Sequence, residues 1–187
     1  TACNCYSPIN PYLIQTETMP SNHFSEVRDE LIGITEKLFR ELDLVDGLIT
    51  IQYIVKDSKP YVIETMRRCL GNRFLTPVTA VTGFPFHKAL VMAELGMDCS
   101  DLKAEEPMAK YAGHHAIMDR NGKYMGTEIP DDIMSHVFEY VELYSKGEML
   151  EKYLSERLGY IYYQYDTPEE IHQAAMTFNE RIKIILE

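Results

Sequence analysis

Apolar residues recur at helical spacing in the first quarter of the chain. They fall three or four positions apart, at Val27, Leu31, Ile34, Leu38 and Leu42. This period predicts an amphipathic helix from Ser25, which can cap it, to about Leu44. Two short helices are predicted further on, from Thr76 to Gly83 and from Phe84 to Gly96. In each of them proline stands near the start and glycine at the end.

Between these helices lie two apolar runs, residues 48–56 and 60–65, which predict a β-hairpin. The polar residue Gln52 interrupts the first run, and Glu64 stands near the end of the second. A two-residue turn would put these side chains on opposite faces, because a register shift of one residue exchanges the faces. We predict a three-residue loop at residues 57–59, which sets Gln52 directly opposite Glu64.

The second half of the chain predicts further strands and one helix. The polar stretch 98–107 favours a boundary before them. Strands are predicted over residues 114–118, 123–127, 137–143 and 158–165, and the first two are expected to form a hairpin across Asn121-Gly122. Thr167-Pro-Glu-Glu170 is a capping box that predicts a helix to about Ile182. A short strand-like stretch is expected to end at residues 12–15.

These elements predict an α+β fold, with an antiparallel sheet on which helices pack and a small C-terminal α+β unit. The predicted division is residues 1–100 and residues 108–187. His114 and His115 are neighbours on a predicted strand, so they should point to opposite faces. We expect packing or surface roles for them rather than metal binding.

Composition narrows the class of function. The 187 residues include 29 Asp and Glu against 18 Lys and Arg, a net charge of -11, which disfavours a nucleic-acid partner. Neither a membrane span nor a secretion signal is recognisable. Four cysteines form no disulfide framework, so the cytoplasm is the expected compartment. Cys3 and Cys5 resemble a weak half of a zinc site, and no matching second pair follows.

The predicted hairpin carries the main candidate chemistry. It presents the amide oxygen of Gln52 and the carboxylate of Glu64, and Arg67 and Arg68 follow at once. Oxygen donors suit a hard cation, and guanidinium groups suit phosphates. The other interpretation is a satisfied strand amide beside a surface ion pair, which contributes little.

The segment Gly47 to Gly71, continued by Thr79-Ala-Val-Thr-Gly-Phe-Pro-Phe-His-Lys-Ala, resembles the C-terminal part of an ATP-grasp domain. The resemblance is to the carbamoyl-phosphate synthase large subunit and to ATP-dependent carboxylate–amine ligases. It implies that Gln52 and Glu64 bind Mg²⁺ or Mn²⁺ at the ATP phosphates. It further implies that Arg68 contacts the nucleotide and has the catalytic role. Arg67 is expected to contact the nucleotide as well, because it can supply positive charge at the phosphates.

Two positions depart from the family pattern. Met66 stands where the family has an asparagine, and Arg67 stands where it usually has a proline. A thioether is a poor ligand for magnesium, so either the second cation site is weaker or Met66 packs into the core. The loop that follows holds Gly71, Asn72 and Arg73, to which the resemblance assigns binding of the acyl substrate. A loop that leads into a helix is the other interpretation.

The resemblance implies an ATP-dependent ligase that joins a carboxylate to an amine or ammonia through an acyl phosphate. Alternatives are a carbamoyl-phosphate synthase-like half that uses bicarbonate, and a nucleotide-binding module whose catalysis has decayed. The lid and N-terminal domain of the family are not recognisable in this sequence. We therefore expect a fragment that is inactive alone and that works with the remaining ATP-grasp domains of the same protein. A homodimer is left open.

Overall fold

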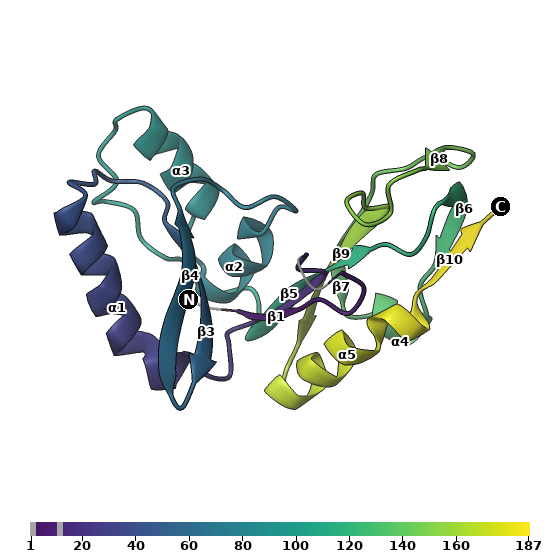
Figure 1. Ribbon diagram of the computed structural model, residues 1–187, viewed down its shortest axis with the longest axis horizontal. Coiled ribbons are helices and arrows are strands. Elements are labelled where there is room, and N and C mark those ends of the chain that lie inside the picture. The colour runs from purple at the N-terminus through teal and green to yellow at the C-terminus, as the bar shows by residue number, and fades with distance from the viewer. Residues whose placement is uncertain (1–2, 11–12) are drawn as a thin grey trace.

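A computed structural model describes residues 3–10 and 13–187 of the chain. Figure 1 shows two lobes side by side, with the N-terminal strands running between them. The first lobe and its entry strands contain β1 (Asn4–Tyr6), β2 (Thr16–Met19), α1 (Phe24–Glu41), β3 (Thr50–Lys56), β4 (Lys59–Met66), α2 (Leu75–Thr82) and α3 (Phe86–Glu94). The rest of the chain contains β5 (Tyr111–Ile117), β6 (Gly122–Glu128), α4 (Asp131–Met134), β7 (Val137–Glu142), β8 (Met149–Leu150), β9 (Gly159–Tyr165), α5 (Pro168–Arg181) and β10 (Lys183–Leu186).

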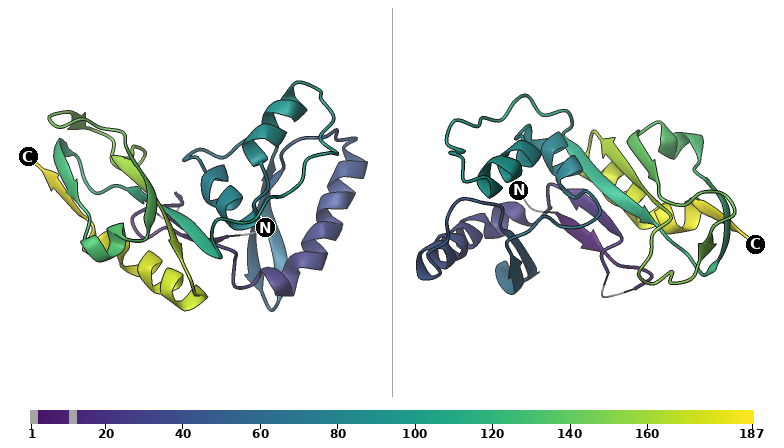
Figure 2. Two further views of the ribbon diagram at one scale, coloured as in Figure 1. Left: turned by 180° about the vertical axis from the view of Figure 1, so that it is seen from behind. Right: turned by 90° about the horizontal axis from the view of Figure 1, so that it is seen from above.

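A five-stranded antiparallel sheet holds the molecule together, in the order β1-β2-β5-β9-β7. Its central strands are buried on both faces, because α5 packs on one face and α2 on the other. The two helices lie on opposite sides of the sheet in Figure 2. The predicted α+β fold with helices on an antiparallel sheet is confirmed.

The sheet also connects the two predicted parts of the chain. Strands β1 and β2 precede residue 100, yet β2 pairs along its whole length with β5, which follows residue 108. The predicted division into residues 1–100 and 108–187 therefore runs across paired strands. The division into two parts stays a prediction.

The main core lies between the sheet and α5. Phe178 of α5 is fully buried, and its ring meets that of Tyr163 on β9 edge-on at 4.8 Å. The helix begins where the capping box predicts, since the Thr167 hydroxyl accepts a hydrogen bond from the Glu170 backbone amide. A smaller three-stranded sheet, β10-β6-β8, extends the same lobe.

The hairpin β3–β4 corrects one prediction about its loop. Its turn has two residues, Asp57 and Ser58, both left-handed at φ 51° and 56°, which is the twist that suits a two-residue hairpin turn. A β-bulge then shifts the register, because Tyr53 pairs with Val62 while Gln52 pairs with Glu64. The predicted three-residue loop is wrong. The bulge supplies the extra residue within the strand instead of in the turn, so Gln52 still lies opposite Glu64.

The expected hairpin between residues 114–118 and 123–127 is also wrong. Strand β5 pairs with β2 and β9, whereas β6 pairs with β10 and β8. Almost every residue of β5 is buried, and β2 and β9 occupy both of its edges, which leaves no edge for pairing with β6.

At the N-terminus a strand was expected to end at residues 12–15. This prediction is wrong for residues 13–15, and Tyr12 lies outside the described residues. Residues 13–15 lie between strands, and β2 begins at Thr16. No helix among residues 3–10 and 13–187 is long and apolar enough to cross a membrane.

Candidate active site

The face of the hairpin turned away from α1 carries the predicted cation ligands. Gln52 and Glu64 are paired across the two strands, and both are exposed. Side chains two positions apart on a strand share a face, so the neighbouring pair Thr50–Met66 lies on the same side. The hairpin thus places an amide oxygen, a carboxylate and a thioether in sequence along one face.

These donors can be compared with the needs of a magnesium ion. The amide oxygen and the carboxylate are hard oxygen donors that project from neighbouring strands, and they fit such an ion. The sulfur of Met66 does not, and its place on this face makes a strong second protein-held cation site unfavourable. The side chains present therefore suit one divalent cation that has further ligands from bound phosphates and water.

The two arginines after β4 differ in what they contact. The guanidinium of Arg67 lies 5.5 Å from the centre of the Phe39 ring and donates to the carbonyls of Val45 and Asp46 at 2.8 and 3.2 Å. Arg67 therefore braces the connection between α1 and β3. The exposed Arg68 donates only to the adjacent Cys69 carbonyl, at 3.2 Å, within the part of the chain described. Arg68 is the freer of the two for an anionic ligand.

Residues 71–73 turn sharply after the arginines. Asn72 and Arg73 are both left-handed, with φ of 57° and 53°. The backbone carbonyl of Asn72 accepts a hydrogen bond from the Tyr162 hydroxyl at 2.8 Å. Arg73 forms an ion pair with Glu139 and lies over the Tyr162 ring at 5.4 Å. These contacts fix the loop against β9 and β7, with the exposed guanidinium of Arg73 able to donate to an anion.

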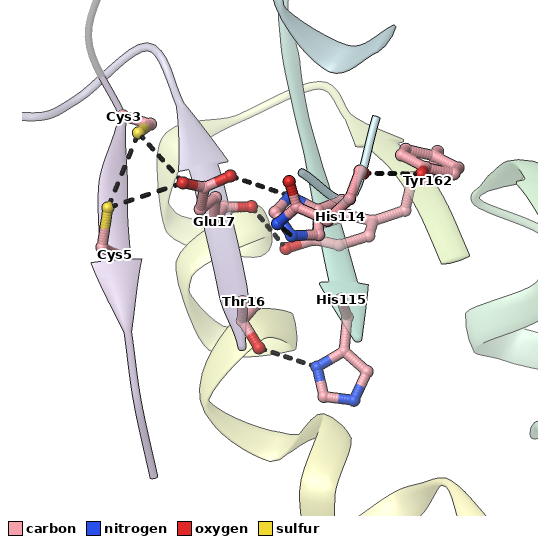
Figure 3. Close-up of polar contacts among 9 residues, drawn as sticks. Cys3, Cys5, Thr16, Glu17, His114, His115 and Tyr162 are labelled. Atoms are coloured by element: carbon pink, nitrogen blue, oxygen red, sulfur yellow. Dashed lines mark hydrogen bonds and ion pairs between the residues drawn. The ribbon is translucent and has the colours of Figure 1, made fainter. Parts of the chain in front are cut away.

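Beneath this loop a row of side chains crosses the five-stranded sheet. The register aligns one residue from each strand, so that neighbours along the row are paired. We call this set the polar row: Cys5, Glu17, His114, Tyr162 and Glu139. Figure 3 shows most of it together with Cys3.

The centre of the polar row is a buried carboxylate–imidazole pair. The side chains of Glu17 and His114 are 2% and 0% exposed. Nδ1 of His114 lies 2.9 Å from Oε2 of Glu17, an ion-pair distance, but the two atoms do not form a hydrogen bond. Nε2 of His114 accepts a hydrogen bond from the Asn72 side-chain amide at 2.8 Å. The loop residue Asn72 is thus connected through His114 to Glu17.

His115 points to the other face, as predicted for neighbours on a strand. It is buried against Phe178, and its Nδ1 atom lies 2.7 Å from the Thr16 hydroxyl. Burial, followed by the charge of the neighbouring His114, lowers the pKa of His115 to about 3. The expected packing role describes both histidines, and both are interior rather than surface groups.

At the outer end of the polar row two cysteines meet Glu17. The sulfurs of Cys3 and Cys5 are 3.6 Å apart, and each lies 3.7 Å from Oε1 of Glu17. The contact with Cys5, burial and the charge of Glu17 together raise the pKa of the Cys3 thiol well above its usual value. All four cysteines of the chain are free.

Glu17 and His114 were not identified as site residues from the sequence, because their pairing joins segments almost a hundred residues apart. One signal was available. Gln15 to Thr18 is an unbroken run of polar residues, and every one of them is buried. Buried polar side chains need partners, so such a run inside a core indicates a network.

Comparison with known proteins places these features in a family context. No protein-family model matches the chain. It is 34% identical over 93 residues to the carbamoyl phosphate synthase large chain of Lachnoclostridium phytofermentans, which covers 50% of this chain and 8% of that protein. It is 33% identical over 100 residues to the C-terminal section of that enzyme from Methanocaldococcus jannaschii, which covers 54% of this chain and 15% of the relative.

Solved structures resemble nearly the whole chain. An L-amino acid ligase from Bacillus licheniformis superposes with a TM-score of 0.79 at 18% identity, over 99% of this chain and 47% of the ligase. Phosphoribosylglycinamide synthetase from Anaerococcus prevotii gives 0.74 at 16% identity, over 99% and 48%. The biotin carboxylase domain of the Hydrogenobacter thermophilus 2-oxoglutarate carboxylase, a complex with MgADP and bicarbonate, gives 0.71 at 14% identity, over 98% and 41%.

The chain therefore spans about half the length of these structures and much less of the curated relatives. The predicted resemblance is confirmed, and the chain has the fold of the C-terminal part of the ATP-grasp ligases.

Proposed function

We propose that the chain is the phosphate- and cation-binding part of an ATP-dependent carboxylate–amine ligase. The observation that carries this proposal is the pairing of Gln52 with Glu64 on an exposed hairpin face of an ATP-grasp fold. Bound Mg²⁺ or Mn²⁺ and ATP would supply the phosphoryl chemistry. Gln52 and Glu64 would hold the cation, and the guanidinium of Arg68 would neutralise phosphate charge by charge-assisted hydrogen bonds.

The loop after the hairpin is the proposed site of the acyl substrate. Asn72 and Arg73 are held against the sheet by Tyr162 and Glu139, so the guanidinium of Arg73 would be positioned before a ligand arrives, and Asn72 would hold the loop in place through its hydrogen bond to His114. Gly71 has no neighbouring atom within 4 Å of where a Cβ would be, so its backbone is open to a close approach. Such preorganisation lowers the entropic cost of binding a carboxylate.

The remaining ATP-grasp domains of the same protein are proposed to cover the hairpin face. Ile54 and Tyr61 form the pair next to Gln52 and Glu64 on that face, and they are 59% and 53% exposed. Apolar side chains beside a charged site favour a partner surface that closes over both. In that arrangement this chain alone would not turn over ATP.

A carbamoyl-phosphate synthase-like half is the second candidate, favoured by the sequence relatives. In that case the carboxylate is bicarbonate and the amine is ammonia. Magnesium-dependent ADP formation by the full-length protein separates the candidates: stimulation by bicarbonate with ammonia supports the synthase, and stimulation by an amino acid supports the ligase. ATP binding with no turnover on either panel supports a decayed nucleotide-binding module.

Glu64→Gln tests the cation site directly. Loss of the carboxylate should lower ADP formation by the full-length protein about 100-fold or more, because charge stabilisation at the phosphates is lost. Glu36→Gln, the same change at an exposed position of α1, is the matched control and should keep the wild-type rate. An unchanged rate in Glu64→Gln would exclude the proposed ligand role.

A further inference from the structure

The cysteine end of the polar row lies apart from the hairpin face and is a compact set of donors. Strand pairing sets Cys5 opposite Glu17, and Cys3 lies two positions earlier, directly before β1. The two sulfurs and Oε1 of Glu17 are separated by 3.6, 3.7 and 3.7 Å. Figure 3 shows all three side chains converging between β1 and β2.

These separations can be compared with a tetrahedral metal centre. Zinc–sulfur bonds of about 2.3 Å and a zinc–oxygen bond of about 2.1 Å imply about 3.8 Å between sulfurs and about 3.6 Å from sulfur to oxygen. The observed separations differ from these by about 0.1 to 0.2 Å. We propose that Cys3, Cys5 and Glu17 bind one thiophilic divalent cation of the zinc class.

The carboxylate is already oriented for this task. Its Oε2 atom lies 2.9 Å from Nδ1 of His114, and its Oε1 atom is directed at the sulfurs. His114 is itself held by the Asn72 amide. Groups that contact a metal-ligating side chain fix its orientation and tune its affinity for the metal. The interior of the sheet thus supplies the supporting contacts that a metal ligand requires.

Charge also favours a cation at this place. Glu17 carries its carboxylate into an almost fully buried position, where an uncompensated charge is unfavourable. Thiols are weak hydrogen-bond donors and compensate it poorly. A divalent cation reverses the local electrostatics, since it stabilises the carboxylate and both thiolates at once. On binding, each thiol releases its proton to solvent, and no electrons are transferred.

The fourth coordination position faces an accessible part of the site. Cys5 is exposed, so water can reach the cation. The Tyr53 hydroxyl is buried and has no hydrogen-bond partner among the described residues. Burial, followed by the charges of Cys3 and Cys5, raises the pKa of Tyr53.

Titration of the reduced protein with Co²⁺ alone tests the proposal. We expect a thiolate-to-cobalt charge-transfer absorption that saturates at one equivalent and is displaced by Zn²⁺. Cys3→Ser and Cys5→Ser should each abolish or strongly weaken it. Cys69→Ser and Cys99→Ser are matched controls and should bind normally. His114→Gln should weaken zinc binding about 10- to 100-fold in a chelator competition.

Several outcomes would overturn the proposal. One is the absence of charge-transfer absorption in reduced protein whose far-ultraviolet circular dichroism shows it to be folded. Another is a signal that persists in the Cys3→Ser, Cys5→Ser double variant. Thiol counting that finds a Cys3–Cys5 disulfide, with no cobalt binding after reduction, would assign the pair to redox chemistry. Glu17→Gln keeps the shape of the side chain, and undiminished affinity in that variant would remove the carboxylate from the site.

Discussion

Acid should destabilise this protein through His115 in a way that can be measured. The imidazole is fully buried between the sheet and α5, and its pKa falls from 6.5 to about 3 in the folded chain. Since the folded pKa is the lower one, this group stabilises the fold above pH 6.5, and that contribution is lost as the pH falls toward 3. At pH 5 the loss relative to neutral pH is about 2 kcal/mol.

The surroundings of the ring support the direction of this effect. His115 meets the Thr16 hydroxyl on one strand and the Phe178 ring on the helix, and neither offers a negative charge. The nearest titratable neighbour, His114, opposes a second positive charge. Neither of these two contacts therefore compensates a protonated ring.

Urea unfolding between pH 5 and pH 8 is the assay. His115→Gln keeps a polar partner for Thr16 but cannot be protonated, so the free energy of unfolding should depend less on pH in this variant by about 2 kcal/mol over that range. His87→Gln, at an exposed position of α3, is the control and should follow the wild type. Equal pH dependence in wild type and His115→Gln would refute the reasoning.

Three further changes have defined outcomes. Gly113→Ala would place a Cβ 2.1 Å from the Glu17 carbonyl, and we expect thermal unfolding to show a loss of about 3 kcal/mol or more. Thr167→Ala removes the cap of α5 and should cost about 1 kcal/mol in urea unfolding. Gly71→Ala meets no atom within 4 Å, so the melting temperature should stay within a few degrees. In the full-length protein, however, KM for the carboxylate should rise, and an unchanged KM would argue against close backbone approach there.

The hairpin shows how far local patterns reach. Two apolar runs identified both strands, since these depend on neighbours in the sequence. The turn was assigned three residues because that register sets Gln52 opposite Glu64, although no glycine was available for the left-handed position of such a loop. Asp57 and Ser58 adopt that conformation nonetheless, and a bulge after Val62 restores the pairing. The error in the loop length and the missed bulge cancel each other, because the twist of the hairpin and the position of the bulge are set together.

The polar row could not be derived in the same way. Strand β2 is short, and its sequence Thr-Glu-Thr-Met has neither the apolar alternation nor the aromatic content of a central strand. Only its position between β1 and β5 makes it buried. The hairpin expected at Asn121-Gly122 failed for a related reason, because burial of β5 on both faces is a property of the assembled sheet. The burial of β2 and the pairing of β5 are therefore determined by residues that are distant in the sequence.

The segment between Glu64 and Asn72 connects the predicted cation site on the hairpin with the polar row of the central sheet. The strand β4 ends at Met66, and only a few residues later Asn72 is bonded to His114 and Tyr162 on the central sheet. Arg67 holds the near side of this connection to the end of α1, and Arg73 holds its far side to Glu139. Residues 68–71 lie between these two sets of contacts. A ligand that bridges Arg68 and Arg73 would cross this segment and restrain it, so binding of phosphate and of acyl substrate should be mutually favourable.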